Sequence, residues 1–477
     1  VPSCGFSPKT LCRIWIRDGV KVNMRRPKGR GRIWKRGEEG FDDAVLATSF
    51  NARDNGARPD MLMEANDTSD VIKALAHARK KNWQVSICSG GHSWAQNHLR
   101  ESGLLLSMAR INHIEIDTKE RVAKVGPGCW GLDLDRSLRK QKLFFPIAHA
   151  PDVALGGYLL QGGFGWGSRE LGLATENVIG LDLILADGSQ IFASESQNSD
   201  IFWAARGSGP GFFAVVIRYH LKLHPRYGFT GLKLQVFRRK HLEAVYQWAE
   251  KIGPQVATSV ELQLLMTPKA LGIFKPGIEV IAPVLTNNWR EAREAIKFLN
   301  ESPIRHLASF TLPLVPLRTS TLSLIANLTH FPPGVRWCTD NMWVNAPVSD
   351  LLPGLNEIAD SMPPAPSHSL WLNWQPTTSR PDMAFSLETN HYLALYGEWT
   401  HAQSDEKYEN WATEKIQKIQ QYGLGIQLAD ENLGRRPARF MADTNLEQLD
   451  ILRDRYDPTK LFRDWMGRHD RDDVPSA

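Results

Sequence analysis

The chain has 477 residues, of which 42% are hydrophobic and 23% charged, a composition that excludes a protein disordered throughout. At roughly 100 to 200 residues per domain, this length predicts two to four domains. No stretch approaches the ~18 consecutive apolar residues of a membrane-spanning helix, so we expect a protein that is not integral to a membrane.

Positive charge is concentrated near the N-terminus. Lys and Arg outnumber Asp and Glu by 57 to 52, which gives a net charge of +5. A basic arm can bind nucleic acid, but one run with a single aromatic, Trp34, is more typical of a solvated tail. We therefore predict that residues 1–40 are a poorly ordered extension and that nucleic acid is not a partner. The basic residues of this run are Arg25, Arg26, Lys28, Arg30, Arg32, Lys35 and Arg36.

The cysteines and the first residues of the chain indicate the cellular compartment of the protein. The five cysteines are an odd number, widely spread and without a Cys-x-x-Cys pair, which predicts neither a disulfide scaffold nor a metal site. Residues 1–23 lack the apolar core and small-residue cleavage site of a secretory signal. We therefore expect a reducing, cytoplasmic location. The cysteines are Cys4, Cys12, Cys88, Cys129 and Cys338.

An α+β pattern begins after residue 41. The polar run at residues 66–70 precedes apolar positions at helical spacing, which predicts a capped amphipathic helix. Residues 84–88, 104–106, 111–116 and 121–125 have the composition and alternation of strands separated by turns. The apolar helix positions are Val71, Ile72, Leu75, Ala76 and Ala78.

A glycine turn follows the strand at residues 84–88. Consecutive glycines beside serines can form a nest of backbone amides that binds a diphosphate, and the histidine of this turn would then face the ligand. A lone histidine is more often an ordinary core residue, but a second glycine-dense loop at residues 150–172 favours a binding site. The string is Ser89-Gly90-Gly91-His92-Ser93.

A Gly-x-Gly-x-x-Gly pattern at residues 126–131 is an alternative dinucleotide site. Pro127 removes one of the amides that such a loop needs, and the preceding elements are strands rather than the start of a βαβ unit. The only acidic residue near the expected spacing, Asp152, lies in a Pro/Gly loop. We therefore consider a Rossmann site the weaker hypothesis.

The remaining chain divides into two parts and a tail. Residues 178–186, 190–193 and 215–223 are predicted strands, the first two joined by a hairpin at Asp187-Gly188. From residue 226 to 430, strands at 259–266, 277–284, 369–374 and 392–399 alternate with helices at 240–251, 288–300 and 405–422, which predicts an antiparallel sheet with helices on one face. A helix at 446–455 precedes the end of the chain.

Taken in order, the motifs resemble the berberine-bridge-enzyme-like FAD-linked oxidoreductases, including their bacterial members, which have a vanillyl-alcohol-oxidase (PCMH) type FAD domain. The similarity extends from about Asn51 to Phe462. It rests on Ser89-Gly90-Gly91-His92-Ser93, the loop from Phe145 to Gly165, Gly172-Leu173-Ala174-Thr175-Glu176-Asn177-Val178, Leu183 to Gly188, Asp200 to Gly207, and Tyr456-Asp457-Pro458 with Leu461-Phe462.

The resemblance implies a two-subdomain FAD-binding domain at 41–225, an inserted substrate domain at 226–430 and a C-terminal segment, 431–477, that returns to the FAD domain. It also implies that His92 bonds covalently to the flavin. The residues expected to bind FAD are Ser89, Gly90, Gly91, His92, Ser93, Gly156, Gly157, Gly162, Gly163, Asn177 and Val178.

Two departures from the family pattern bear on this attachment. Many relatives attach the flavin a second time through a cysteine in a Cys-Pro-Thr-Val-Gly string, and the matching segment here is Ala150-Pro151-Asp152-Val153-Ala154. Because Ala150 has no thiol, we expect a single covalent link through His92. Cys88 stands where relatives commonly have arginine, and we interpret it as a small buried residue.

For catalysis, the resemblance implies that a hydride leaves a C–OH or C–N substrate for flavin N5 while a side chain takes the adjoining proton. Alternation along the strand at 392–399 puts Tyr392, Tyr396 and Glu398 on one face, and we name these as candidate bases, although ordinary sheet roles are equally compatible. Trp371 and Trp374 cannot share a face, but with aromatics of facing strands they could form a flat slot.

The expected substrate is a small molecule, either aromatic, alkaloid-like or a sugar, and the expected electron acceptor is O₂. Tyr158, which the family pattern places on the approach of oxygen to the flavin, is bulky and argues partly against this acceptor. The alternatives are a dehydrogenase that uses another acceptor and a non-catalytic binding protein that has lost its cofactor.

Overall fold

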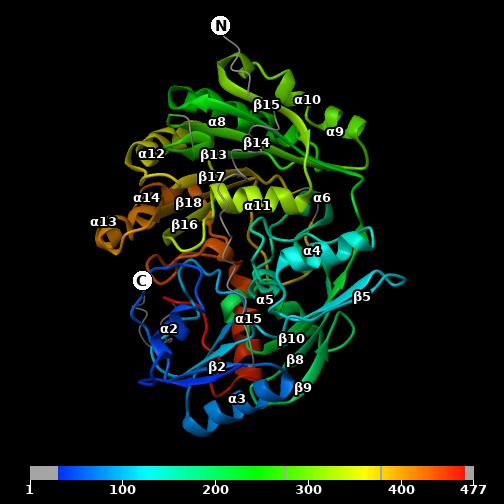
Figure 1. The fold of residues 1–477 in the computed structure, drawn as a ribbon, viewed down its shortest axis with the longest axis vertical. Helices are drawn as coiled ribbons and strands as arrows, with labels where there is room; N and C mark the ends of the chain where they lie inside the picture. Colours follow the sequence, from blue (N-terminus) through cyan, green and yellow to red (C-terminus); the bar gives the residue numbers. More distant parts are fainter. Residues whose placement is uncertain (1–30, 273–274, 377–378, 468–477) are drawn as a thin grey trace.

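The computed structural model describes residues 31–272, 275–376 and 379–467. Figure 1 shows two halves, with a large sheet and its helices in the upper half and two smaller sheets in the lower half. The fold class is α+β, with an antiparallel-sheet domain inserted in the chain, as the sequence predicted. No helix within the described residues is long and apolar enough to cross a membrane.

The first small sheet is built around a βαβ unit. Helix α3 (Thr68–Lys81) connects β2 (Met61–Glu64) to β3 (Val85–Cys88), and β4 (Leu104–Ser107) lies between these strands, parallel to both. The Asp67 side chain accepts a hydrogen bond of 3.0 Å from the Asp70 amide and caps α3, which confirms the predicted helix start. Val71, Leu75 and Ala78 of α3 are buried against the sheet.

The prediction for residues 1–40 was wrong at its C-terminal end. Residues 1–30, with most of the basic run, lie outside the described residues. Residues Ile33–Lys35, however, form β1, an antiparallel edge strand on β2, and α2 (Phe41–Leu46) follows it. The edge of β2 offers unpaired amides and carbonyls, and a short charged strand can satisfy them despite its weak hydrophobic pattern.

The second small sheet is antiparallel and has five strands. Its spatial order is β5 (Ile114–Asp117), β6 (Val122–Val125), β10 (Val215–Lys222), β8 (Val178–Ile184) and β9 (Gln190–Ala193). The short pair β7 (Leu143–Phe144) and β11 (His224–Pro225) lies apart from it. The helices of this region are α4 (Gly131–Lys140), α5 (Leu155–Leu160), α6 (Ser168–Leu171) and α7 (Ser199–Ala204).

This sheet excludes the Rossmann hypothesis for residues 126–131. Strand β6 pairs antiparallel with β5 and β10, so the glycine pattern does not follow the first strand of a parallel unit. A Cβ atom at Gly126 would lie 2.2 Å from the Ile111 carbonyl oxygen, and one at Gly128 would lie 2.6 Å from that of Ala109. These glycines therefore allow two chain segments to pack closely.

The inserted domain is an eight-stranded antiparallel sheet with helices on one face. Its strands, in spatial order, are β15 (Ala308–Pro316), β12 (Phe229–Arg238), β14 (Gly277–Thr286), β13 (Gln263–Thr267), β17 (His368–Asn373), β18 (His391–Trp399), β16 (Arg336–Val344) and β19 (Gly423–Gly425). The covering helices are α8 (Leu242–Ile252), α9 (Trp289–Ala295), α10 (Lys297–Asn300), α12 (Val348–Ser361), α13 (Asp405–Tyr408) and α14 (Trp411–Ile419).

The two faces of this sheet have different neighbours. Leu393 and Leu395 of β18 pack with the covering helices, whereas Tyr392 and Tyr396 face the lower half of the molecule. Trp371 and Trp374 also lie in different clusters, as predicted. Helix α11 (Thr319–Thr329) lies between the large sheet and the lower half in Figure 1.

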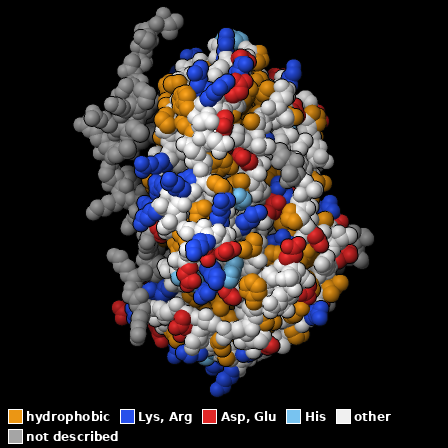
Figure 2. Space-filling view, turned by 90° about the vertical axis from the view of Figure 1, so that its right-hand side faces the viewer, with side chains coloured by type: hydrophobic (Ala, Val, Ile, Leu, Met, Phe, Trp, Pro, Cys, Tyr) orange, Lys and Arg blue, Asp and Glu red, His pale blue; other side chains and the backbone are white. Residues whose placement is uncertain are grey.

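The C-terminal segment returns to the first small sheet. Helix α15 (Asp443–Tyr456) lies in the lower half of Figure 1, and Phe462 forms a parallel bridge with Val85 of β3. Leu461 and Phe462 are buried in the same core as α3. Figure 2 shows that positively and negatively charged side chains are interspersed over the face of the molecule seen there.

Candidate active site

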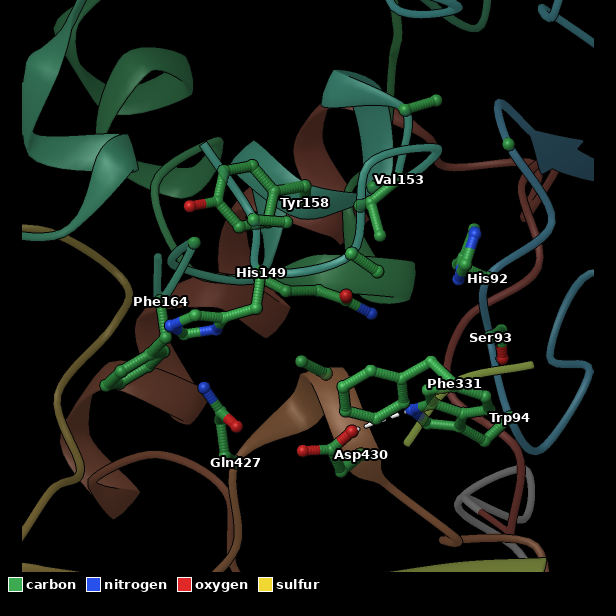
Figure 3. A pocket seen from close by; sticks show the side chains of 18 of the residues that line it. His92, Ser93, Trp94, His149, Val153, Tyr158, Phe164, Phe331, Gln427 and Asp430 are labelled. Atoms are coloured by element: carbon green, nitrogen blue, oxygen red, sulfur yellow. Dashed lines mark hydrogen bonds between the residues drawn. The ribbon is translucent and has the colours of Figure 1, made fainter. Parts of the chain in front are cut away.

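A cavity of about 380 Å³ is lined by both halves of the molecule. The lower half contributes the loop after β3 and the chain that leads into α5, and the upper half contributes β17, β18 and residues 427–430. Figure 3 shows His92, Val153 and Tyr158 on one side of the space and Trp94, Phe331 and Asp430 on the other. A volume of this size is typical of a small-molecule site.

Most of the predicted cofactor residues line this cavity. The exceptions are Gly162, Asn177 and Val178, which are not among the described lining residues. Asn177 instead donates to the carbonyls of Leu171 and Leu173 at 3.0 and 3.1 Å, so it orders the turn that precedes β8. The lining residues are Ser89, Gly90, Gly91, His92, Ser93, Gly156, Gly157 and Gly163.

The glycines differ in what surrounds them. Gly91 has φ +74°, and a Cβ there would lie 1.8 Å from the Thr48 carbonyl oxygen. A Cβ at Gly157, by contrast, would meet no atom within 4 Å. Gly91 is therefore required by close backbone packing, whereas Gly157 leaves open space at the cavity wall that a cofactor can use.

His92 is held on three sides. Its Nε2 lies 3.1 Å from Asp152 Oδ1, and both side chains are about nine-tenths buried, with 12% and 10% of their surface exposed. The Phe50 ring stacks on the imidazole at a centroid distance of 4.1 Å, and Trp94 meets it edge-on at 6.1 Å. Burial alone would raise the pKa of Asp152, but the charge and hydrogen-bonding effect of His92 keep that pKa below its ordinary value.

Asp430 is a buried carboxylate at the opposite wall. The hydroxyls of Tyr392 and Tyr396 donate to its Oδ2 at 2.5 and 2.9 Å, and the Trp94 indole donates to Oδ1 at 2.7 Å. Burial raises the pKa of Asp430 above its ordinary value, although these hydrogen bonds oppose the increase. All four residues line the cavity, so a proton acceptor lies within reach of a bound molecule.

Glu398 is placed differently from the two tyrosines. It shares their sheet face, but it is not among the described lining residues, and its Oε1 lies 3.2 Å from Nδ1 of His368. Burial raises the pKa of Glu398 well above its ordinary value. His368, whose ring stacks on Tyr396 at 4.7 Å, is the member of this pair that reaches the cavity.

A second histidine–carboxylate pair joins the two halves. His149 Nε2 lies 2.6 Å from Glu261 Oε1, and the His149 ring meets Trp166 edge-on at 4.4 Å. Although burial opposes it, Glu261 raises the pKa of His149 above its ordinary value. The nearby Tyr158 hydroxyl donates to the Pro146 carbonyl at 3.0 Å.

Sequence reasoning missed Asp430 and His149, which line the cavity, and the contact of His149 with Glu261 behind it. Asp430 lies five residues after β19, a strand of only three residues, and residues 426–433 contain neither glycine nor histidine. The partners of Asp430 are 34 to 38 residues away on β18, and 336 away at Trp94. A local pattern contains no information about contacts of that kind.

Comparisons with known proteins agree with this architecture. A family model described as an FAD binding domain matches residues 59–194. The FAD-linked oxidoreductase ptmO of Penicillium ochrochloron is 30% identical over 434 residues, which cover 89% of this chain and 94% of that protein. The FAD-linked oxidoreductase janO of Penicillium janthinellum is 28% identical over 432 residues, covering 88% and 94%.

Solved structures share the whole fold. The structure of 6-hydroxy-D-nicotine oxidase from Arthrobacter nicotinovorans superposes with a TM-score of 0.79 at 21% identity and covers 91% of this chain and 97% of that one. The family model and the named relatives imply FAD as the cofactor, and the open wall at Gly157 leaves space for it. The chain belongs to the FAD-linked oxidoreductases, contains an FAD-binding domain and shares the fold of the berberine-bridge-enzyme-like proteins.

Proposed function

We propose that this FAD-linked oxidoreductase oxidises a C–OH or C–N bond of a small molecule held between the glycine loops and Asp430, and passes the electrons to O₂. The observation that carries the proposal is the shared cavity, in which the predicted flavin loops face a buried carboxylate bound by two tyrosines. FAD bound there would supply the group that accepts a hydride. The chain supplies the proton acceptor on the other side of the substrate.

The two glycine-rich segments are suited to hold the cofactor. Amides of Ser89 to Ser93 would bind its diphosphate. Gly156 packs against Ser89, and Gly157 would admit the ring system along the open wall. His92 would form the covalent link. With Ala150 at the position of the second anchor in relatives, that link would be single.

Tyr392, Tyr396 and Asp430 would act together on the substrate proton. A substrate O–H or N–H that approaches either tyrosine oxygen can lose its proton through the hydroxyl to Asp430, because both hydroxyls already donate to Oδ2. Burial raises the pKa of each tyrosine well above its ordinary value, so the phenols stay protonated and the carboxylate is the net base. Glu398 is not among the described lining residues and is therefore not favoured for this role.

The aromatic walls favour a flat or ring-shaped substrate. Phe164, Trp94 and Phe331 line the cavity, and Trp94 and Phe331 stack at a centroid distance of 6.0 Å. Structural neighbours include a 6-hydroxy-D-nicotine oxidase and a chitooligosaccharide oxidase. These features support an aromatic, alkaloid-like or sugar substrate.

The proposed acceptor depends on access to the flavin. Among the neighbours, wild-type Phl p 4.0202 is a glucose dehydrogenase, whereas an isoleucine-to-valine variant of Phl p 4 is a glucose oxidase, so a small change can separate the two activities. Here Val153 and Tyr158 both line the cavity, and Figure 3 shows Val153 nearer to His92 than Tyr158 is. The Tyr158 hydroxyl is engaged by Pro146, and its ring is anchored away from His92. This arrangement favours O₂ over a bulkier acceptor.

The test is anaerobic mixing of the purified holoenzyme with aromatic alcohols, cyclic amines and oligosaccharides, followed by admission of air. We expect one class to bleach the flavin absorbance and air to restore it. Bleaching that persists in air but reverses with a quinone would show a dehydrogenase, and Tyr158→Ala would then show whether this ring blocks oxygen. A protein that no member of the panel bleaches would contradict the proposed substrate classes.

A further inference from the structure

The loops that carry His92 and Asp152 are locked together. A Cβ atom at Gly90 would lie 2.7 Å from the Ala154 Cβ and 3.0 Å from the Ala154 nitrogen, so the loop after β3 rests directly on the segment that leads into α5. Asp152 Oδ1 lies 3.1 Å from His92 Nε2 across this contact. The pair is therefore set by backbone packing and not by two mobile side chains.

The imidazole has little freedom to turn. Phe50 lies nearly parallel to it, at 22°, and Trp94 lies nearly perpendicular, at 84°. Asp152 Oδ1 is buried and has no hydrogen-bond partner of good geometry in the described part of the chain, and its near polar neighbour is His92 Nε2 at 3.1 Å. With Nε2 directed to the carboxylate, Nδ1 is the nitrogen left to form a bond.

Asp152 lies in the segment where many relatives have their second flavin anchor. The segment Ala150-Pro151-Asp152-Val153-Ala154 matches the string in which many relatives have Cys-Pro-Thr-Val-Gly. This chain thus has no thiol for a second anchor, and two residues later it has a carboxylate in place of a threonine. The carboxylate faces the residue expected to be the remaining anchor.

We propose that Asp152 is the positioning residue for covalent attachment of the flavin: its carboxylate holds the Nε2–H of His92, directs the Nδ1 lone pair to the 8α carbon, and stabilises the positive charge that the imidazole gains as the new bond forms. A carboxylate behind an imidazole fixes the tautomer and stabilises the charge that develops on the ring. The inference rests on the proposed attachment through His92.

The reaction balances with O₂ as the oxidant. A bond forms between Nδ1 and the 8α carbon, and a C–H bond of the 8α methyl group breaks. One proton leaves from that methyl group, and one leaves the imidazolium for water once the bond has formed. The two electrons left in the flavin ring system pass to O₂, which is reduced to hydrogen peroxide with the two protons.

The electrostatics are consistent with this role. Burial alone would raise the pKa of Asp152 and favour its neutral form, yet the His92 contact keeps that pKa below its ordinary value. The group is therefore an anion at neutral pH. Asp152→Asn keeps the shape and the acceptor oxygen of the side chain but removes the charge.

The test measures attachment rather than turnover. Full-length protein from riboflavin-limited cells is mixed with FAD, samples are precipitated with acid, and the flavin fluorescence of the denatured protein is followed over time. We expect Asp152→Asn to bind FAD, as judged by its spectrum, but to form the acid-stable bond at least about 10²-fold more slowly than wild type. Asp152→Glu should retain part of the rate, and formate should restore part of it to Asp152→Ala.

Two control variants give the lowest and the unperturbed rates of flavin attachment. His92→Ala gives the rate without an anchor. Glu261→Gln removes a carboxylate that lies beside a different cavity histidine, His149, and is not itself among the described lining residues, so this variant should attach flavin at the wild-type rate.

Several results would overturn the inference. The first is attachment at the wild-type rate by Asp152→Asn, and the second is slowing by Glu261→Gln as large as that by Asp152→Asn. The third is slow attachment by Asp152→Glu together with no rescue of Asp152→Ala by formate. This third result would indicate that Asp152 acts through packing and not through its charge. Wild-type protein that releases all its flavin in acid would overturn both this role and the attachment. The oxidation reaction would then still be judged by its own bleaching test.

Discussion

Asp430 shows how one buried residue sets the chemistry of the cavity. An isolated carboxylate so deeply buried would be neutral, but three donors partly compensate for the lost hydration. Its pKa lies above the ordinary value because burial has the larger effect. The residue is thus poised to accept a proton, and its pKa should be sensitive to each donor.

Removal of either tyrosine hydroxyl tests this balance. Tyr392→Phe or Tyr396→Phe removes a hydrogen bond that lowers the pKa of Asp430, so that pKa should rise further. Because the carboxylate must be ionised to accept a proton, the acidic limb of the flavin-bleaching rate against pH should move to higher pH in both variants. An unmoved or lowered acidic limb would contradict Asp430 as the base.

Glu279 gives a separate prediction about stability. It is 1% exposed, accepts a hydrogen bond from the Leu271 amide at 2.7 Å, and burial raises its pKa from 4.5 to about 7. A carboxyl group whose folded-state pKa is raised stabilises the fold fully below its unfolded pKa, and this contribution is lost as the pH rises through the folded pKa.

Glu279→Gln should therefore gain stability relative to wild type as the pH rises from 4.5 to about 7. A shift of this size corresponds to about 3 kcal/mol in the free energy of unfolding. Urea denaturation of both proteins across this pH range measures the difference. A difference that stays constant with pH, or that moves against the variant, would contradict the raised pKa.

At the scale of elements, an alanine substitution in each of the two glycine loops should affect stability differently. Gly157→Ala places a methyl group in open space within α5, so folding should be unimpaired, and helix propensity favours alanine by up to about 1 kcal/mol. The methyl group would project toward the proposed cofactor path and lower the flavin content. Gly91→Ala should destabilise the protein itself, because its Cβ would overlap the Thr48 carbonyl and φ is +74°.

The ratio of flavin absorbance to protein absorbance and the unfolding midpoint separate these cases. Gly157→Ala should lose flavin while keeping its midpoint, and Gly91→Ala should lose both. A fully flavinated Gly157→Ala protein would show that the open wall is not the cofactor path.

Elements with strong local signals could be predicted from the sequence. The cap at Asp67 and the alternation along 392–399 appear in α3 and β18 as expected, because the cap is local and a half-buried strand requires alternation. The helix predicted at 405–422 is instead α13 and α14, separated at residues 409–410. Helical spacing of apolar residues does not reveal such a break when both segments pack on the same sheet.

Only part of the site could be predicted from the sequence. Local glycine strings and the family resemblance identified the His92 loop and the face of β18. Asp430 joins them because β16, β18 and the 427–430 segment pack together, with the Asn341 side chain donating to the carbonyls of Gln427 and Asp430. Such long-range packing has no signature within any window of the sequence.

At the scale of the whole molecule, the C-terminal segment stabilises the first small sheet. Phe462 is 1% exposed and is buried in the same core as α3. It forms a bridge with Val85 of β3, the strand that leads into the His92 loop. Phe462→Ala should reduce the free energy of unfolding by about 3 to 5 kcal/mol through the lost apolar burial and the cavity left behind. Ile451→Ala, which alters a side chain that is 67% exposed on α15, is the matched control and should change it by less than about 0.5 kcal/mol.

Chemical denaturation followed by tryptophan fluorescence checks this pair. Equal, small effects of both substitutions would show that the returning segment does not support the sheet.

The proposed chemistry depends on a cavity in which the flavin loops of one half of the molecule face a proton acceptor, Asp430, from the other half. Its most direct test is the rate of anaerobic flavin bleaching in Asp430→Asn, with the substrate that bleaches wild type. We predict a protein that keeps its flavin but bleaches at least about 10²-fold more slowly. Bleaching at the wild-type rate would contradict the account, because the proton would then leave by a route that does not involve Asp430.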